Sequence, residues 1–582
     1  MSQSVSESLL DVLAEAGGRD VFGVTGDALN PFVEAIRKDD RFRWIGMRHE
    51  EHAAYAAFAQ SEINGKIGIC AGTTGPGALH LINGLYNAKK EGGAVVAITG
   101  QVSRRERGSD FHKEVDLTKM FDDICAYQAV INSPAQMPRM VEIAVQKALV
   151  ERSVVRIELP SDVIELDVPS QHFKHPLVHD RSAILPPAHA ITRAAGLINE
   201  GKRVTLLCGI GCRESKAEVL ALAQKLSAPI VHTLRAKDIF DYDDPNVVGM
   251  TGLIGNPGGY HAVWDCDVLL MLGTDFPYDE FIPDGKVIIQ VDRVVDHIGR
   301  RAPVSLGLVG TVHETLAALA PQVEGSNQSA KFLGHLEKLR DHWLKQMDAQ
   351  ASLTRTDEPL HPQLFAKVIS DKAADDALFA VGVGECTVWV ARQMRMGGGR
   401  RMAGSFNHGS LGGALPVAMG LAALDPKRQV WAIAGDGEFG MSMNEFVSAV
   451  RFGWPLKVIV FNNSELGFVK MEMEVSGLPI FPDATGLVNP DFAAYAKACG
   501  GDGVRVEHAA DIVPAIEQAL ASDKPFIIDA IVSPGELTMP PTITIKEAWG
   551  FGISKVKEAL IGVKGDHEIW QGWRDEFRAN VF

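Results

Sequence analysis

The stretch VWAIAGDGEFGMSMNEF, which starts at Val430, places one carboxylate between two glycines directly after an apolar run. Asp436 lies between Gly435 and Gly437, and Asp and Gly are both common in tight turns. Glycines also leave room for a phosphate to approach the backbone, and a carboxylate beside them can hold a hard cation such as Mg²⁺. The residue types and their spacing are therefore compatible with a turn or with a metal–phosphate site.

A second apolar run after the GDG triplet also ends in polar residues, the dipeptide Asn462-Asn463. The GDG triplet and the dipeptide Asn462-Asn463 are separated by the segment Glu438 to Phe461, which contains one predicted helix and then the apolar strand KVIVF. A strand–helix–strand unit returns its second strand parallel to the first, so both carboxyl ends meet at one edge of the sheet. Asp436 and Asn463 are thus predicted to bind one Mg²⁺, and the amides of the turn and helix start to bind a diphosphate.

This combination of GDG and NN resembles the diphosphate-binding motif of thiamine-diphosphate enzymes. The resemblance implies thiamine diphosphate and Mg²⁺ as cofactors, with the metal held by Asp436, Asn463 and the backbone carbonyl of Glu465. RHEEHAA (48–54) resembles the glutamate motif of that family, with Glu50 as the carboxyl group. An acid at the aminopyrimidine favours the imino tautomer, whose nitrogen takes the C2 proton and yields the ylid.

Other stretches resemble the loops that surround this cofactor. GSFNHGSLGGALP (404–416) resembles the loop around its middle, with Leu411 beneath the V-shaped thiamine; AGTTGPGALHLINGL (71–85) resembles the glycine-rich turn of the pyrimidine-binding domain; VGVGEC (381–386) resembles the loop on the diphosphate side. Two residues depart from the pattern, because many relatives carry Asp where this chain has Gly382 and a small residue where it has Glu438. The cofactor-binding residues implied are Gly384, His408, Gly409, Ser410, Leu411, Gly435, Asp436, Gly437, Asn463, Leu466, Gly467 and Phe468.

Within the acetolactate synthase-like superfamily, the chain most resembles the pyruvate oxidase branch, particularly the bacterial pyruvate:quinone oxidoreductases. Strings such as GVTGDALN (23–30), VGMTGLIG (248–255), FNNSELGFVKMEM (461–473) and PPTITIKEAWGF (540–551) carry this resemblance. It implies oxidative decarboxylation of pyruvate or a related 2-oxo acid via hydroxyethyl-thiamine diphosphate, with electrons passing to FAD and then to a quinone, and with acetate and CO₂ released. The alternative is a non-oxidative carboligase or decarboxylase of the acetolactate synthase type with a structural flavin.

The same resemblance implies catalytic residues and an assembly. The catalytic residues implied are Glu50, His80, His112, Phe468 and Glu472. Relatives commonly show Phe-Gln-Glu where this chain has His112-Lys113-Glu114; these side chains either favour a more polar 2-oxo acid or point to solvent. Taken by itself, a histidine on an apolar helix, such as His80, is more often a packed core residue. The assembly implied is a homotetramer in which Glu50 of one subunit faces the GDG–NN site of another.

The middle of the chain resembles the FAD site of these enzymes. CGIGC (208–212), HTLRAKD (232–238), TGLIG (251–255), GTDFPY (273–278) and an acid after IIQV carry the resemblance, and an acid that follows a strand suits a ribose hydroxyl. One departure is Gly310-Thr311, where the family usually has Gly-Asp, so a vestigial or ADP-binding middle domain remains the alternative. The flavin-binding residues implied are Arg235, Lys237, Thr251, Gly252, Leu253, Gly273, Thr274, Asp275 and Asp292.

The elements that must position these residues are short apolar strands alternating with helices, which predicts an α/β protein with parallel sheets flanked by helices. At 582 residues the chain exceeds one core. Linker-like stretches at 168–190 and 322–360 divide it into a thiamine pyrimidine-binding domain (1–175), a Rossmann-like FAD-binding domain (185–330), a thiamine diphosphate-binding domain (355–540) and a C-terminal tail (541–582).

Composition limits the possible partners and location. With 57 Lys and Arg against 73 Asp and Glu, the net charge is −16, which argues against nucleic-acid binding. The seven scattered cysteines are expected to be reduced thiols, and neither a secretory signal nor a membrane span is predicted, so a cytoplasmic location is expected. In the tail, Ile569, Trp573, Phe577 and Val581 recur every four residues. This amphipathic stripe suits either a neighbouring subunit or peripheral contact with the inner face of the cell membrane.

Overall fold

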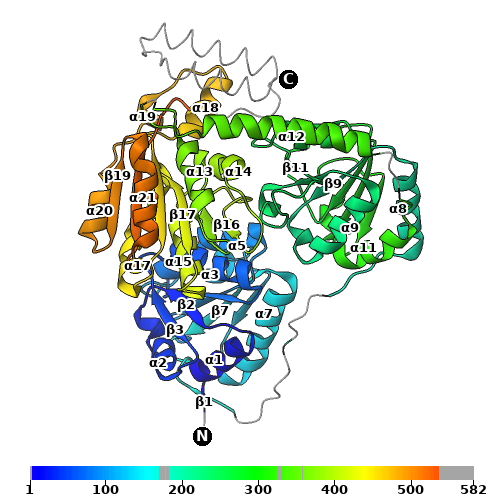
Figure 1. Ribbon diagram of the computed structural model, residues 1–582. Coiled ribbons are helices and arrows are strands. Elements are labelled where there is room, and N and C mark those ends of the chain that lie inside the picture. The colour runs from blue at the N-terminus through cyan, green and yellow to red at the C-terminus, as the bar shows by residue number, and fades with distance from the viewer. Residues whose placement is uncertain (1–2, 170–176, 178–181, 326–328, 357, 537–582) are drawn as a thin grey trace.

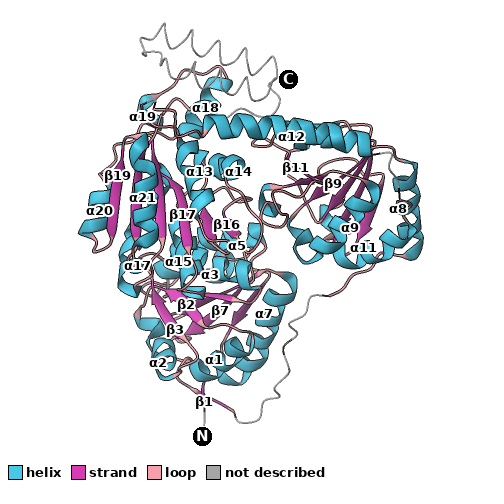
Figure 2. Ribbon diagram, viewed as in Figure 1, coloured by secondary structure: helices cyan, strands magenta, loops and turns pink. Residues whose placement is uncertain are grey.

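The computed structural model describes residues 3–169, 177, 182–325, 329–356 and 358–536 (Figure 1). Within them the chain forms three six-stranded parallel sheets flanked by helices, which confirms the predicted α/β class (Figure 2). A short antiparallel pair, β1 (Gln3–Ser4) with β8 (Asp167–Val168), stands apart from these sheets. The predicted amphipathic tail and the stretch 540–551 lie outside the described residues. Among the described residues, no helix has both the length and the apolar composition needed to cross a bilayer.

The first and third sheets share one strand order. Numbered along the chain within each sheet, both run 2-1-3-4-6-5. The first sheet consists of β3 (Arg43–Gly46), β2 (Asp20–Gly23), β4 (Gly68–Gly72), β5 (Val95–Gln101), β7 (Val154–Pro160) and β6 (Tyr127–Val130). The third consists of β16 (Arg401–Gly404), β15 (Leu378–Val381), β17 (Val430–Gly435), β18 (Lys457–Asn462), β20 (Phe526–Ile531) and β19 (Asp502–Val506).

The middle sheet has the order 3-2-1-4-5-6, which is the order of dinucleotide-binding domains. Its strands are β11 (Val247–Met250), β10 (Ile230–His232), β9 (Val204–Cys208), β12 (Val268–Leu272), β13 (Val287–Asp292) and β14 (Leu306–Val309). Ligands of open α/β sheets bind where the strand order reverses, beyond the carboxyl ends of the strands. In the middle sheet that point lies between β9 and β12, and in the third sheet it lies between β15 and β17.

Helices cover both faces of the sheets. Those of the first part are α1 (Val5–Glu15), α2 (Asn30–Lys38), α3 (Glu50–Asn64), α4 (Pro76–His80), α5 (Ile82–Glu91), α6 (Leu117–Met120) and α7 (Met137–Glu151). The middle part has α8 (Ala188–Glu200), α9 (Lys216–Leu226), α10 (Pro257–Trp264) and α11 (Val312–Leu319). The last part has α13 (Pro362–Lys372), α14 (Glu385–Gln393), α15 (Ala414–Leu424), α16 (Asp436–Ser442), α17 (Phe446–Phe452), α18 (Gly467–Val475), α19 (Pro482–Thr485), α20 (Phe492–Ala498) and α21 (Ala509–Ala521).

The first and third parts share a core through α3 and α15 (Figure 1). Both helices are rich in Ala, and their facing residues are buried. A Cβ at Gly420 would lie 2.2 Å from the carbonyl oxygen of Ala56, so only glycine permits this close approach. α12 (Ala330–Gln350) runs from the middle part to the third part and contacts both α10 and α14.

The predicted strand–helix–strand unit is confirmed, because β18 pairs with β17 in parallel register. The single helix expected between them was wrong: α16 and α17 are separated by a 3-10 turn at Met443–Glu445. Glu445 at this break is fully buried and accepts the backbone N–H of Arg48 at 2.7 Å. The turn therefore places a carboxylate against the first part of the chain.

Candidate active site

One cavity of about 1560 Å³ joins the switch point of the middle sheet to that of the third sheet. Most of the residues predicted to bind cofactors line it. From the third part these are Gly384, Gly409, Leu411, Gly435, Asp436, Gly437, Asn463, Glu465, Leu466, Gly467, Phe468 and Glu472. From the middle part they are Arg235, Thr251, Gly252, Leu253, Gly273, Thr274, Asp275 and Asp292.

Asp436 is the buried carboxylate at one end of this cavity. It is only 3% exposed, and its Oδ2 accepts the Ser464 N–H at 2.7 Å and the Asn489 side-chain amide at 2.8 Å. Burial raises the pKa of Asp436 to about 6, because the charged form loses water. A cation at this position would offset that loss, so the residue fits a divalent metal.

Asn463 adds an amide oxygen on the neighbouring strand end. Its Oδ1 accepts the Glu465 N–H at 3.0 Å, and its Nδ2 donates to Glu385 Oε2 at 3.2 Å. Ser464 has a φ of 58°, and this left-handed residue turns the chain sharply after β18. The carboxylate and amide oxygens at adjacent strand ends form the oxygen-rich donor set that Mg²⁺ prefers.

Two glycines leave open space at the same edge. A Cβ at Gly384 or at Gly435 would meet no atom within 4 Å, and these residues precede the first turns of α14 and α16. Neither helix start has a side-chain cap, so backbone N–H groups are available to an anion. These features fit a diphosphate bound beside the metal.

Glu385, the first residue of α14, was missed by sequence reasoning. Burial and the nearby carboxylates, Glu536 first among them, raise its pKa to about 8. It also lines the cavity beside Asn463. The only available signal was its position directly after the VGVG loop, where a carboxylate is unexpected next to a diphosphate.

The other end of the cavity fits a dinucleotide. Gly211 and Gly273 come so close that a Cβ on Gly211 would lie 2.7 Å from the Cα of Gly273. The hydroxyl of Thr251 is buried with no hydrogen-bond partner among the described residues, as expected for a group that awaits a ligand. Asp292 ends β13 and lies 3.2 Å from His297 Nδ1. Thr311, at the departure from the family pattern, lines the same cavity and donates to the carbonyl of Ile184 at 3.2 Å.

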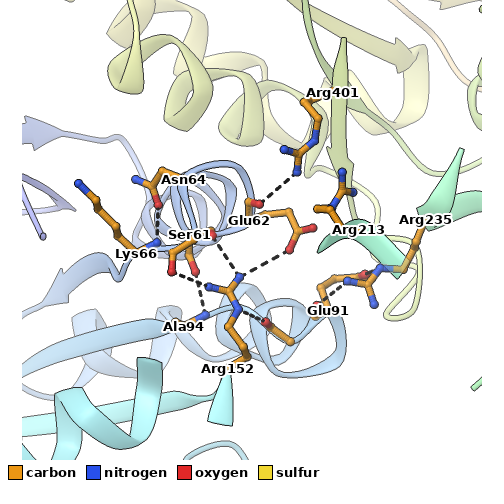
Figure 3. Close-up of polar contacts among 12 residues, drawn as sticks. Ser61, Glu62, Asn64, Lys66, Glu91, Ala94, Arg152, Arg213, Arg235 and Arg401 are labelled. Carbon is orange, nitrogen blue, oxygen red and sulfur yellow. Dashed lines mark hydrogen bonds and ion pairs between the residues drawn. The ribbon is translucent and has the colours of Figure 1, made fainter. Parts of the chain in front are cut away.

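Arginines gather where the three parts of the chain meet along the cavity (Figure 3). Arg235 Nε lies 2.9 Å from Glu91 Oε2, and the Nη2 of Arg401 donates to the backbone carbonyl of Glu62 at 3.4 Å. Burial raises the pKa of Glu91, against the opposing charge of Arg235. Glu91 also accepts the backbone N–H of Asn407, so it links the middle part to the loop that carries Leu411.

Four predicted residues are not among those that line the cavity. Glu50, 6% exposed at the start of α3, has its Oε2 2.9 Å from His80 Nδ1. Asn83 connects the other two, because its Nδ2 donates to Ser410 Oγ at 2.9 Å and its Oδ1 lies 2.9 Å from His408 Nε2. The chain therefore brings Glu50 and His80 together but does not bring them to the cavity that holds Asp436.

His112 and Lys237 are also outside the cavity. His112 is exposed, and its neighbour Lys113 has a φ of 65° and an ion pair with Asp27 at 3.4 Å. Lys237 is buried beside a separate small cavity of about 40 Å³, and burial lowers its pKa to about 8. Among the described residues, no hydrogen bond or ion pair joins either side chain to the residues predicted to bind the flavin or the diphosphate.

Comparison with known proteins agrees with this architecture. Three protein-family models match the chain. They are the N-terminal TPP binding domain of thiamine pyrophosphate enzymes at residues 3–120, the central domain at 191–319 and the C-terminal TPP binding domain at 382–530. The chain is 34% identical over 550 residues to YdaP of Bacillus subtilis, which is described as a thiamine pyrophosphate-containing protein. The matched region covers 94% of this chain and 95% of YdaP.

Two further relatives have named activities. The acetolactate synthase large subunit of Corynebacterium glutamicum is 29% identical, over 90% of this chain and 86% of its own. The pyruvate oxidase of Lactiplantibacillus plantarum is 26% identical, over 92% of this chain and 89% of its own. The chain belongs to the thiamine pyrophosphate enzyme family, and it is a thiamine-diphosphate-dependent enzyme with N-terminal, central and C-terminal domains.

Proposed function

We propose that this enzyme oxidatively decarboxylates pyruvate or a related 2-oxo acid, passing electrons to FAD and then to a quinone and releasing acetate and CO₂. The observation that carries the proposal is the single cavity that links the GDG edge of the third sheet to the dinucleotide edge of the middle sheet. An electron donor bound at one end and a flavin at the other would share this enclosed space. Similarity to a pyruvate oxidase over most of both chains supports the same reaction.

When bound, thiamine diphosphate supplies a nucleophilic carbon and an electron sink, and FAD supplies a two-electron acceptor. Asp436, Asn463 and the backbone carbonyl of Glu465 would hold Mg²⁺ and, through it, the diphosphate. Leu411 would support the cofactor from below. Glu50 would hold and move the proton at the aminopyrimidine ring nitrogen, with His80 as its neighbour at 2.9 Å.

The wall that faces a substrate would be built by α18. Phe468 and Glu472 lie on this helix and line the cavity. Burial raises the pKa of Tyr278, and the nearby charges of Glu280 and Glu472 add to the rise, so α18 approaches the middle domain at this point. These side chains would orient a 2-oxo acid and exclude water between the two cofactor sites. Because His112 is exposed in this chain, its contribution to selectivity would require a partner subunit.

A second candidate is a carboligase or decarboxylase in which the flavin has no redox role. The similarity to an acetolactate synthase large subunit favours it. Anaerobic mixing of the flavin-loaded enzyme with pyruvate separates the two. Bleaching of the flavin absorbance together with CO₂ release is the expected result, and quinone addition should restore the oxidised spectrum. CO₂ release with a flavin that stays oxidised would contradict the oxidoreductase proposal.

We also propose a homotetramer whose smallest active unit is a dimer. The position of Glu50 away from the cavity supports this, because a second copy could bring its own Glu50 to the GDG site.

A further inference from the structure

Glu438, directly after the GDG triplet, is buried inside the third domain. Glu438 is 2% exposed, and each of its carboxyl oxygens accepts a hydrogen bond from a backbone N–H. Oε2 accepts the N–H of Val383 at 2.8 Å, and Oε1 accepts the N–H of Ala414 at 3.0 Å. The sulfur of Cys386 lies 3.9 Å from Oε2. The hydrogen bonds of this carboxyl group are therefore made to the protein backbone at the edge of the large cavity.

These two hydrogen bonds connect three separate segments. Val383 lies in the loop between β15 and α14, and Ala414 is the first residue of α15, directly after the loop that carries Leu411. Glu438 itself lies in the first turn of α16, two residues after Asp436. All three segments line the end of the cavity where the metal and diphosphate would bind. One side chain thus sets the spacing between the loops on three sides of that site.

The neighbouring glycine shows why only one carboxyl group fits here. A Cβ at Gly382 would lie 1.8 Å from Oε2 and 2.6 Å from Cδ of Glu438. Atoms cannot approach that closely, so the Glu438 carboxyl group occupies the volume of a side chain at position 382. The two positions are 56 residues apart in sequence (438 − 382) and exclude each other in space.

We propose that Glu438 is a positioning residue that holds the diphosphate-side loop and the Leu411 loop in their binding geometry, and that its carboxyl group can be supplied from position 382 instead. The proposal rests on the proposed function only in that thiamine diphosphate binds at this site. It involves neither the oxidation step nor the identity of the 2-oxo acid. A buried carboxyl group that satisfies two N–H donors leaves both unsatisfied when it is removed.

The test is a charge relocation between the two positions. The variants are Glu438→Gly, Gly382→Asp and the double variant, and the primary readout is the dissociation constant of Mg²⁺–thiamine diphosphate for the apo-protein, followed by tryptophan fluorescence. Glu438→Gly should weaken binding at least tenfold, because two loops lose their shared acceptor. Gly382→Asp should weaken it by a similar factor, because two carboxyl groups compete for one space. The double variant should recover to within about threefold of the unmodified enzyme.

Glu438→Gln covers the case in which Glu438→Gly does not fold. It keeps the volume but turns an NH₂ group toward one of the two N–H donors, so an intermediate loss of affinity is expected. The control is Glu158→Gln, a fully buried glutamate on β7 whose Oε2 lies 2.6 Å from Arg156 and which does not line the cavity. It should lower stability without changing cofactor affinity.

The proposal is overturned if Glu438→Gly or Glu438→Gln binds the cofactor as tightly as the unmodified enzyme. It is equally overturned if the folded double variant binds no better than the weaker single variant. Because affinity is measured without substrate, a failure of pyruvate to bleach the flavin would refute the proposed reaction and leave this result unaffected.

Discussion

The large cavity and the face around Glu50 differ in what a single chain can complete. The cavity gathers residues from two sheets, because the switch points of the middle and third sheets open toward each other. Glu50 lies at the start of α3, whose buried side packs on α15, and it faces His80 rather than Asp436. One chain therefore brings together the proposed metal, diphosphate and flavin sites but leaves Glu50, the proposed proton-transfer residue, outside the cavity. We propose that a second copy of the chain completes the site.

Removing Asp436, the proposed metal ligand, should have the largest effect. Asp436→Ala is expected to weaken Mg²⁺-dependent binding of thiamine diphosphate by at least about 100-fold and to reduce turnover below detection, since it deletes a charged ligand. Fluorescence titration with and without Mg²⁺ measures this. Asp371→Ala, which removes an exposed partner of Lys367, is the control and should bind normally. Unchanged affinity of Asp436→Ala would place the metal elsewhere.

On the other face, Glu50→Gln should lower turnover by roughly 10² to 10⁴, the range typical of a lost general acid or base. Its affinity for the cofactor should change less than about threefold, because the cavity that holds the diphosphate is intact. Steady-state kinetics and titration of the apo-protein give both numbers. Glu34→Gln, on α2, removes an exposed partner of Arg37 and serves as the control, which should retain turnover. Equal losses of turnover and affinity in Glu50→Gln would mean that Glu50 is structural.

The class of the sheets and the strand pairing at the GDG site could be predicted from the sequence. Apolar strands that end in Gly, Asp or Asn indicated parallel sheets and the pairing of β17 with β18, since parallel strands bring their carboxyl ends to one edge. The residues of the GDG and NN turns accordingly meet in one cavity. The domain boundaries and the individual roles of the site residues stay predictions.

What the sequence could not reveal depends on three-dimensional packing. Gly382 and Glu438 each depart from the family pattern, and their complementarity is visible only where the two loops touch. The resemblance carried by the HTLRAKD stretch implied that Arg235 and Lys237 both bind the flavin. Instead, Leu234–Ala236 form a 3-10 turn, in which residues two apart face different sides. Arg235 therefore lines the large cavity, while Lys237 is buried beside the small one.

The flavin end should respond more modestly to a single change. Thr251→Val removes a buried hydroxyl that has no partner among the described residues, so FAD affinity should fall about tenfold with little loss of stability. Release of FAD on dilution, followed by flavin fluorescence, measures it. Thr205→Val is the control, because the Thr205 hydroxyl donates to the Ala262 carbonyl at 2.6 Å inside the same domain. Thr205→Val should lose stability and keep its flavin. If Thr251→Val instead loses stability and keeps its flavin, Thr251 does not belong to the flavin site.

The smallest functional effect is expected at Lys237. Its pKa falls from 10.5 to about 8 on burial, so between those pH values the unfolded chain holds a proton that the native protein has lost. Stability therefore rises as the pH increases across this range, and Lys237→Met should be up to about 3 kcal/mol more stable than the unmodified protein at pH 7. Urea unfolding at several pH values tests this.

Flavin affinity of Lys237→Met should stay unchanged, because Lys237 lies off the large cavity. A tenfold loss of flavin affinity would show that the residue belongs to the cofactor site after all.

The most direct test of the central claim is complementation between two inactive variants. Glu50→Gln and Asp436→Ala are unfolded together, refolded as a mixture and assayed for pyruvate-dependent turnover. If Glu50 and Asp436 of one site come from different copies, each mixed dimer contains one intact site, and activity should return to roughly a quarter of the unmodified level. If both residues of a site come from the same chain, no mixed dimer has an intact site. A mixture as inactive as its components would contradict the account.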